Sequence, residues 1–319
     1  MKIYVKQLIF KPPLQVSAAP PQPIVLTLGF FDGVHRGHQA VIKTGKKIAL
    51  AKKIPLAVMT FNIHPAVVYR GVSETDIRYL STREEKIKIM QSLGVDYLYV
   101  VHFTPDFAAL TPQAFVDQYL VGLKADTVVA GFDYTYGKRD VASMALLPKY
   151  ACGRFDVISV PELAEDGQKV SSTRIRHALD SSDIDTANDF LGYTYTTAGK
   201  VVHGEARGRL LGFPTINLET LGQQRLPGIG IYAVKVKVGT TWYLGMASIG
   251  RNVTFGADRD VTLEINLLDF NQMIYGETVQ VRWYHYLRGE VKFAGADALI
   301  DQLKKDETAV RDYFAAKKG

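Results

Sequence analysis

The chain has 319 residues, of which 47% are hydrophobic and 22% are charged, and its formal net charge is +6. These values are ordinary for a soluble globular protein, and the length suits two domains. The only cysteine, Cys152, excludes an internal disulfide, argues against a structural zinc site and fits a reducing compartment.

The chain shows no sign of a membrane or export segment. No apolar run reaches the length needed to span a bilayer, and the N-terminal residues lack the apolar core and cleavage site of a signal peptide. We therefore expect a cytoplasmic protein. Its modest positive charge is spread along the chain, and a phosphate-bearing small molecule explains this charge as well as a nucleic acid does.

The first half of the chain alternates short apolar runs with helical patterns. A proline-rich loop at 11–23 leads to a strand at 24–28, and a glycine-rich turn at 29–38 joins this strand to a helix that starts near Gly37. Further strands are predicted at 56–61, 95–101, 127–130 and 155–158, and helices at 83–93 and 111–123. This alternation predicts a parallel doubly wound sheet, in which ligands bind at the carboxyl ends of the strands.

The glycine-rich turn is the first candidate site. Its glycines permit positive φ, and the helix that follows directs free N–H groups back at the turn, which favours phosphate. His35 and His38 are three residues apart and share one face of that helix. The spacing matches neither the dinucleotide fingerprint nor a Walker A loop. The alternative is a pair of ordinary solvated or packed histidines.

Other polar clusters fall where predicted strands end. Asn62 and His64 follow one strand, and Asp133 and Tyr134 follow another. At 170–176, Ser171 or Ser172 caps a short helix that carries Arg176, which makes a second anion-binding corner or, alternatively, a plain helix cap with a solvated arginine. The pattern breaks at 180–183, where we place the domain boundary.

The second half reads as short alternating strands. They are predicted at 231–238, 241–247, 261–268 and 278–284, and they favour an antiparallel barrel. A C-terminal helix carries one apolar face, formed by Leu299, Ile300, Leu303, Val310, Tyr313 and Phe314.

A second glycine-rich stretch, 204–217, lies within this barrel. Its glycines and arginines suit phosphate, and Thr215 with Asn217 offers oxygen ligands for Mg²⁺; the alternative is a hairpin whose glycines serve the turn. Glu264 lies in an alternating strand. It is a general base towards an alcohol if it faces the barrel mouth, and a solvated residue if it faces outward.

Taken together, these motifs resemble the bacterial bifunctional riboflavin kinase/FAD synthetase family, from about residue 8 to 316. The resemblance is carried by the sequences GFFDGVHRGH at 29–38, FNIHP at 61–65, GFDY at 131–134, SSTRIR at 171–176, GRLLGFPTIN at 208–217 and EINLLDF at 264–270. It implies a Rossmann-like nucleotidyltransferase domain at 1–182 and a six-stranded β-barrel riboflavin kinase domain with a C-terminal helix at 183–319.

The resemblance also implies two ATP-dependent reactions with Mg²⁺. The second domain would phosphorylate riboflavin to FMN, and the first would transfer an adenylyl group from ATP to FMN, which yields FAD and pyrophosphate. The implied partners are ATP and the flavins, with no membrane and no nucleic acid.

The resemblance implies a role for particular residues in each domain. In the first domain, His35 and His38 would bind phosphate and stabilise charge. The other implied ATP contacts there are Gly29, Phe30, Phe31, Asp32, Gly33, Gly37, Ser172, Thr173 and Arg176. The implied flavin or adenine contacts are Asn62, His64, Gly131, Phe132, Asp133 and Tyr134.

In the kinase domain, Glu264 would be the base, and Thr215 and Asn217 would bind the metal and ATP. The remaining implied ATP contacts are Gly208, Arg209, Gly212, Phe213 and Pro214. The chain departs from the family pattern at Asn62 and Ile63, in the loop 138–143, which lacks a glycine, and at Ser248 and Val253.

Three alternatives remain open. One module alone could be active. The chain could be a flavin-binding regulator that has lost catalysis and touches RNA or DNA. It could also be a nucleotidyltransferase acting on pantetheine phosphate or nicotinamide mononucleotide, although such an enzyme would not need the attached barrel.

Overall fold

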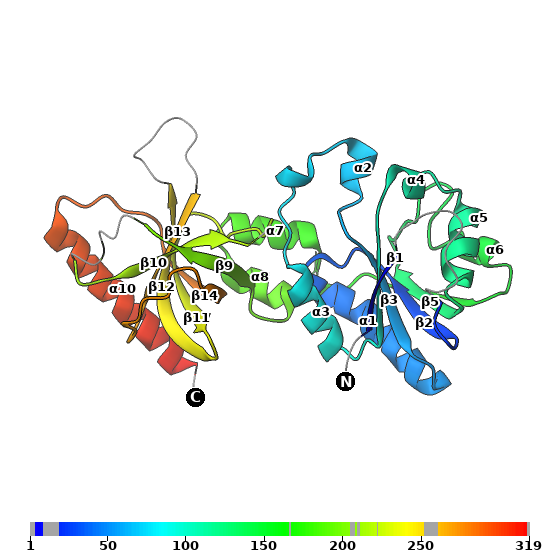
Figure 1. Ribbon diagram of the computed structural model, residues 1–319, viewed down its shortest axis with the longest axis horizontal. Helices are drawn as coiled ribbons and strands as arrows, with labels where there is room; N and C mark the ends of the chain where they lie inside the picture. The colour runs from blue at the N-terminus through cyan, green and yellow to red at the C-terminus, as the bar shows by residue number, and fades with distance from the viewer. Residues whose placement is uncertain are drawn as a thin grey trace. The chain divides into compact units, whose positions relative to one another are not determined.

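The computed structural model describes residues 4–8, 19–165, 167–204, 208, 211–221, 223–251 and 261–317. The chain divides into two compact units, Met1–Ser171 and Ser172–Gly319, which Figure 1 shows as a sheet with helices and as a barrel. A functional boundary after residue 182 stays a prediction. Part of the expected loop at 11–23, together with Arg209 and Val253, lies outside the described residues.

The first unit is built on a parallel six-stranded sheet with the order β1-β4-β3-β2-β5-β6, which confirms the predicted doubly wound class. Every residue of the central strands β2 and β3 is buried, and all of them except Thr27 and Thr60 are apolar. The strand β1, which pairs with β4 at the sheet edge, was not predicted. The strands are β1 (Tyr4–Leu8), β2 (Ile24–Leu28), β3 (Leu56–Phe61), β4 (Tyr97–Val101), β5 (Ala125–Gly131) and β6 (Asp156–Val160).

Helices cover both faces of this sheet (Figure 1). Ile24, Leu26 and Leu28 pack on the side of α4 to α6, while Val25 packs with α1 and α3. The helices are η2 (Asp32–Val34), α1 (Arg36–Lys52), α2 (Ala66–Arg70), η3 (Glu74–Asp76), α3 (Arg83–Ser92), α4 (Pro105–Ala108), α5 (Pro112–Phe115), the π-helical η4 (Val116–Val121) and α6 (Leu147–Ala151). A short hairpin, β7 (Ala164–Glu165) and β8 (Gln168–Lys169), completes the unit.

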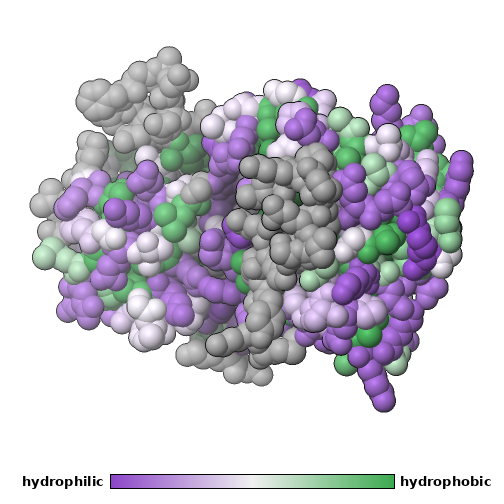
Figure 2. All heavy atoms as spheres, turned by 45° about the vertical axis from the view of Figure 1, so that its right-hand side comes forward, coloured by the Kyte–Doolittle hydropathy of each residue, from purple (hydrophilic) through white to green (hydrophobic). Residues whose placement is uncertain are grey.

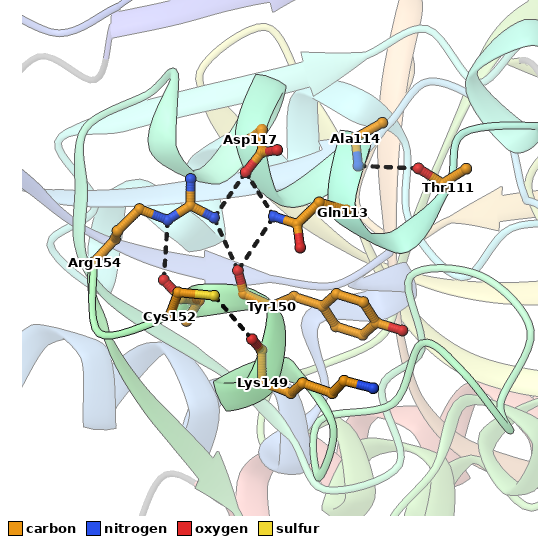
Figure 3. A network of polar contacts seen from close by, with 9 residues as sticks. Thr111, Gln113, Ala114, Asp117, Lys149, Tyr150, Cys152 and Arg154 are labelled. Atoms are coloured by element: carbon orange, nitrogen blue, oxygen red, sulfur yellow. Dashed lines mark hydrogen bonds and ion pairs between the residues drawn. The ribbon is translucent and has the colours of Figure 1, made fainter.

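The helix predicted from Thr111 consists of α5 and η4. The hydroxyl of Thr111 caps it by accepting a hydrogen bond of 3.2 Å from the backbone N–H of Ala114. On η4, the carboxylate of Asp117 accepts from Gln113 Nε2 at 2.8 Å and pairs with Arg154 Nη2 at 2.7 Å. These contacts, drawn in Figure 3, join α5 and η4 to the end of α6.

The second unit is a closed antiparallel barrel with the order β10-β13-β12-β11-β14-β9, which confirms the predicted six-stranded barrel. Two strands were not predicted individually: β9 precedes the second glycine-rich stretch, and β10 begins within it at Thr215. The elements are α7 (Ser172–Asp180), α8 (Ile184–Leu191), β9 (Thr196–Val202), β10 (Thr215–Thr220), β11 (Gly230–Val238), β12 (Thr241–Arg251), β13 (Val261–Leu267), β14 (Thr278–Arg288) and α10 (Ala296–Ala316).

Helices α7 and α8 belong to this unit because they are bonded to the barrel. Asp180 at the end of α7 pairs with Arg225, whose Nε lies 2.7 Å from Oδ1 of the carboxylate. Asn188 on α8 donates a hydrogen bond of 2.9 Å to the carbonyl of Trp283. The long α10 lies along the barrel in Figure 1, with Val310 and Phe314 buried against it.

Hydrophilic residues dominate the face drawn in Figure 2, where apolar side chains form only small groups. Over the stretches that the structure describes, no helix combines the length and the apolar character that a membrane crossing requires.

Candidate active sites

The glycine turn follows β2 at the centre of the first unit's sheet. The order of the strands reverses between β2 and β5, and ligands of such sheets bind at this switch point, beyond the carboxyl ends of the strands. The backbone of the turn is left-handed at Phe31, Gly33 and Val34, with φ of 55°, 73° and 37°. A buried β-branched residue such as Val34 rarely adopts positive φ, so the turn is strained and must be held by its surroundings.

The loop before α3 holds this turn. Asp32, only 3% exposed, accepts a hydrogen bond of 2.9 Å at Oδ1 from the backbone N–H of Leu80. In return, the backbone N–H of Gly33 donates to Ser81 Oγ at 3.2 Å. Asp32 therefore acts on the shape of the turn through the backbone of the neighbouring loop.

The structure brings His35 and His38 together. Their rings stack with centroids 3.6 Å apart, and His35 caps α1 by accepting at Nδ1 a hydrogen bond of 3.3 Å from the backbone N–H of His38. The pKa of His38 lies well below its ordinary value, first because the ring is buried and then because His35 and Lys86 add positive charge. At neutral pH His38 is thus a neutral imidazole, which can form hydrogen bonds but carries no charge.

Phe30 connects the turn to the loop after β3. Its ring meets the edge of the His64 ring at a centroid distance of 5.0 Å, and Lys86 on α3 lies 4.6 Å above the Phe30 ring. Lys86 was not singled out from the sequence, where it is one of several charged residues in the helix predicted at 83–93.

The expected flavin contacts fall into two groups. His64 and Tyr134 line a cavity of about 320 Å³. Its walls are largely aromatic and include Phe61, Tyr69, Phe103, Phe107, Phe115 and Tyr136. Asn62 does not line this cavity. Its Oδ1 accepts a hydrogen bond of 2.8 Å from the backbone N–H of Phe103, which fastens the end of β3 to the end of β4.

Phe132 and Asp133 contact Lys169 of the β7–β8 hairpin. Lys169 Nζ lies 3.0 Å from the carboxylate of Asp133 and 5.0 Å above the ring of Phe132, which is 45% exposed. The expected ATP contacts Ser172, Thr173 and Arg176 lie on α7, in the second unit. Their part in an ATP site stays a prediction.

In the barrel, Glu264 faces a cavity. Its Oε2 accepts a hydrogen bond of 3.2 Å from Thr215 Oγ1, and Asn217 is its direct partner across the paired strands β10 and β13. All three line a cavity of about 960 Å³ together with Gly208 and Phe213. Of the two orientations left open for Glu264, the structure therefore has the one towards the cavity.

Gly204 lies directly against the side chain of Asn217. A Cβ atom on Gly204 would lie 2.0 Å from Asn217 Nδ2, so a larger residue there would have to displace the Asn217 side chain. Pro214 and Thr215 line a neighbouring cavity of about 350 Å³, beside the loop 270–275. Thr215 thus belongs to both cavities, whereas Glu264 lines only the larger one.

The comparisons with known proteins agree with this arrangement. A family model for FAD synthetase matches residues 17–174, and one for riboflavin kinase matches residues 191–314. The chain is 50% identical over 291 residues to the bifunctional riboflavin kinase/FMN adenylyltransferase of Listeria monocytogenes, which covers 91% of this chain and 92% of that protein. It is 42% identical over 294 residues to the Bacillus subtilis protein of the same description, and the match covers 91% of this chain and 92% of that protein.

A crystal structure of a Streptococcus pneumoniae protein described as a macrolide-efflux protein also matches. The two share 38% identity with a TM-score of 0.88, over 96% of this chain and 98% of that one. The two family models follow one another in the order of the two compact units. The chain therefore belongs to the family of bifunctional riboflavin kinases/FMN adenylyltransferases, with the FAD synthetase domain first and the riboflavin kinase domain second.

Proposed function

We propose that the barrel phosphorylates riboflavin with Mg-ATP and that the first unit then joins the FMN to an adenylyl group from a second ATP. The observation that carries this proposal is the contact between Thr215 and Glu264 in a cavity large enough for a flavin. Both reactions consume ATP, which supports the expectation of a cytoplasmic enzyme.

For the kinase step we assign the two barrel cavities to the two substrates. Riboflavin occupies the larger cavity, because Glu264 lines it and needs the terminal hydroxyl of the ribityl chain within reach. ATP occupies the neighbouring cavity, and its γ-phosphate lies at Thr215, which both cavities share. Glu264 accepts the hydroxyl proton, the hydroxyl oxygen attacks the γ-phosphorus, and ADP leaves.

Thr215 and Asn217 are the residues that would hold Mg²⁺. A hydroxyl and an amide oxygen are hard ligands that suit this ion, and Mg²⁺ commonly completes its octahedron with waters and substrate phosphates. Across the described ranges no group of three histidine, cysteine or acidic side chains gathers to hold a resident metal. Two neutral donors such as Thr215 and Asn217 fit an ion that arrives with ATP, which would neutralise the phosphate charge.

For adenylyl transfer we assign the turn at 29–38 to the ATP phosphates and the cavity between His64 and Tyr134 to the flavin ring. An oxygen of the FMN phosphate is already anionic at neutral pH, so the reaction requires positioning and charge stabilisation more than a base. His35 and His38 provide hydrogen bonds to phosphate, and we expect Ser172, Thr173 and Arg176 to add to that site.

The test is to incubate the purified chain with riboflavin, ATP and Mg²⁺ and to separate the flavins. We expect FMN first and FAD later, while a start from FMN isolates the second reaction. Absence of both products refutes the proposal, and flavin binding without turnover would identify a regulator instead. Formation of only one of the two products would show that only one module is active.

A further inference from the structure

Lys86, in the first turns of α3, lies directly beside the glycine turn. Its Nζ donates a hydrogen bond of 2.9 Å to the backbone carbonyl of Phe30. The residue as a whole keeps some contact with solvent, but burial of the ammonium group lowers the pKa of Lys86 to about 8, against the opposing charge of Asp32. A buried cation costs free energy unless something compensates it.

The hydrogen bond to Phe30 does not account for the burial of this cation. Thr60 Oγ1 donates to the same carbonyl at 2.8 Å, so that oxygen is satisfied without the lysine. Within the described stretches the ammonium group forms no ion pair with a carboxylate and no second hydrogen bond. Because an ammonium group carries three N–H donors, two of them have no protein acceptor there.

A second polar group beside Lys86 is also incomplete. His38 Nδ1 is buried, and it has no hydrogen-bond partner among the residues whose positions are described. The two groups come from different helices, α3 and α1, and both adjoin the strained turn at Phe31–Val34. The two remaining N–H donors of Lys86 and the unpartnered Nδ1 of His38 would be completed by the oxygens of a polyphosphate.

We propose that Lys86 is a further phosphate-binding catalytic residue of the adenylyl-transfer site, an inference that rests on the adenylyl transfer proposed above. In that reaction an oxygen of the FMN phosphate forms a bond to the α-phosphorus of ATP. The bond from this phosphorus to the oxygen that bridges to the β-phosphate breaks, and its electron pair leaves with pyrophosphate. Lys86 donates hydrogen bonds to the departing pyrophosphate, and no proton is transferred.

The test compares Lys86→Met with Lys88→Met in the full chain, since Lys88 is exposed on the same helix. We expect kcat for FAD formation to fall on the order of 10- to 100-fold in Lys86→Met, as for loss of a charged hydrogen bond, with KM for FMN unchanged. The rate of riboflavin phosphorylation by Lys86→Met should stay unchanged, which serves as the internal control of folding. Lys88→Met should keep the rates of both reactions. Lys86→Arg, which keeps the charge, should recover much of the loss.

Thermal unfolding separates this role from a structural one. Lys86→Met should melt no lower than the unmodified protein, because it removes a poorly compensated buried cation. FAD formation in Lys86→Met equal to that in Lys88→Met would overturn the proposal. If Lys86→Met does not fold, Lys86→Gln takes its place, and the measurement is inhibition of FAD formation by added pyrophosphate. Equal inhibition of Lys86→Gln and the unmodified chain would also overturn the proposal. Absence of FAD formation in the unmodified chain would instead refute the proposed adenylyl transfer itself.

Discussion

Thr215 Oγ1 donates a hydrogen bond of 3.2 Å to Glu264 Oε2 across the paired strands β10 and β13. This contact places a hydroxyl, which can bind a metal or phosphate, against a carboxylate that can accept a proton. Because the barrel register fixes both strands, the two groups keep this spacing without help from a loop.

The first prediction concerns Glu264. Glu264→Gln preserves the shape and the contact to Thr215 but removes the proton acceptor, so FMN formation should fall by about 10²- to 10⁴-fold. FAD formation from added FMN should stay unchanged, since it belongs to the other unit. Glu277→Gln, a change at an exposed residue directly before β14, is the control. Unchanged FMN production in Glu264→Gln would refute the assignment of the base.

His38 gives the converse prediction. His38→Ala removes a buried imidazole beside the strained turn and should lower FAD formation by about 10²- to 10³-fold, as for loss of a preorganised donor. FMN formation should persist. The matched variant is His177→Ala, which alters an exposed histidine on α7. The measurement is separation of flavins after incubation with FMN and ATP, and an active His38→Ala enzyme would exclude this histidine from the site.

The sequence predicted most of the architecture because the evidence is local. Apolar runs such as 24–28 and the proline after Thr111 suffice to place strands and helix starts. The edge strand β1 escaped prediction, since its significance lies in pairing with β4 far along the chain. Lys86 escaped for the same reason, because only the packing of α3 against the turn gives it a role.

At the candidate sites, the sequence predicted the residues that stand in compact motifs. It did not predict the contacts that these residues make. The sequence left the orientation of Glu264 open, and the cavity resolved it. Asn62 was expected at the flavin, yet its side-chain oxygen binds the backbone N–H of Phe103. A side chain's partner across the fold cannot be read from its neighbours in the chain.

Gly204 supports a third prediction, which is steric. A Cβ atom there would lie 2.0 Å from Asn217 Nδ2, so Gly204→Ala must displace the amide that we assign to the metal. We expect a higher KM for Mg-ATP in the kinase reaction and an unaltered FAD synthetase reaction. Gly295→Ala is the control, because a Cβ atom there meets no atom within 4 Å. Equal kinase kinetics in the two variants would contradict the role of Asn217.

Metal removal tests whether Mg²⁺ arrives with ATP. A chelator should abolish FMN formation, and added Mg²⁺ should restore it in proportion to the Mg-ATP complex. Because Thr215 and Asn217 offer only two neutral ligands, calorimetry should detect no tight binding of Mg²⁺ to the chain without nucleotide. Tight binding of Mg²⁺ alone would show a resident metal and would contradict this view of the site.

The last prediction follows from the lowered pKa of Lys86. With a pKa of about 8, its ammonium group is charged below pH 8 and neutral above it, so FAD formation should decline as the pH rises through about 8. Asp32 on the turn and His38 on α1 are the titratable groups that face it; the Asp32 carboxylate raises the pKa of Lys86 against its burial, and His38 is uncharged in this range because its own pKa is lowered. Lys86→Arg should move this decline to higher pH, because a guanidinium stays charged.

Stability should respond to the same titration in the opposite direction. In the unfolded chain Lys86 keeps its proton up to about pH 10.5, so between about pH 8 and 10.5 the unfolded state binds more protons than the folded one. The contribution of Lys86 to the free energy of unfolding therefore rises with pH over the range in which activity is lost. Denaturant titrations of the unmodified chain and Lys86→Met at pH 7 and 9.5 measure this difference. A loss of activity accompanied by a matching loss of stability in the unmodified chain alone would show that pH acts on folding and not on the charge at the site.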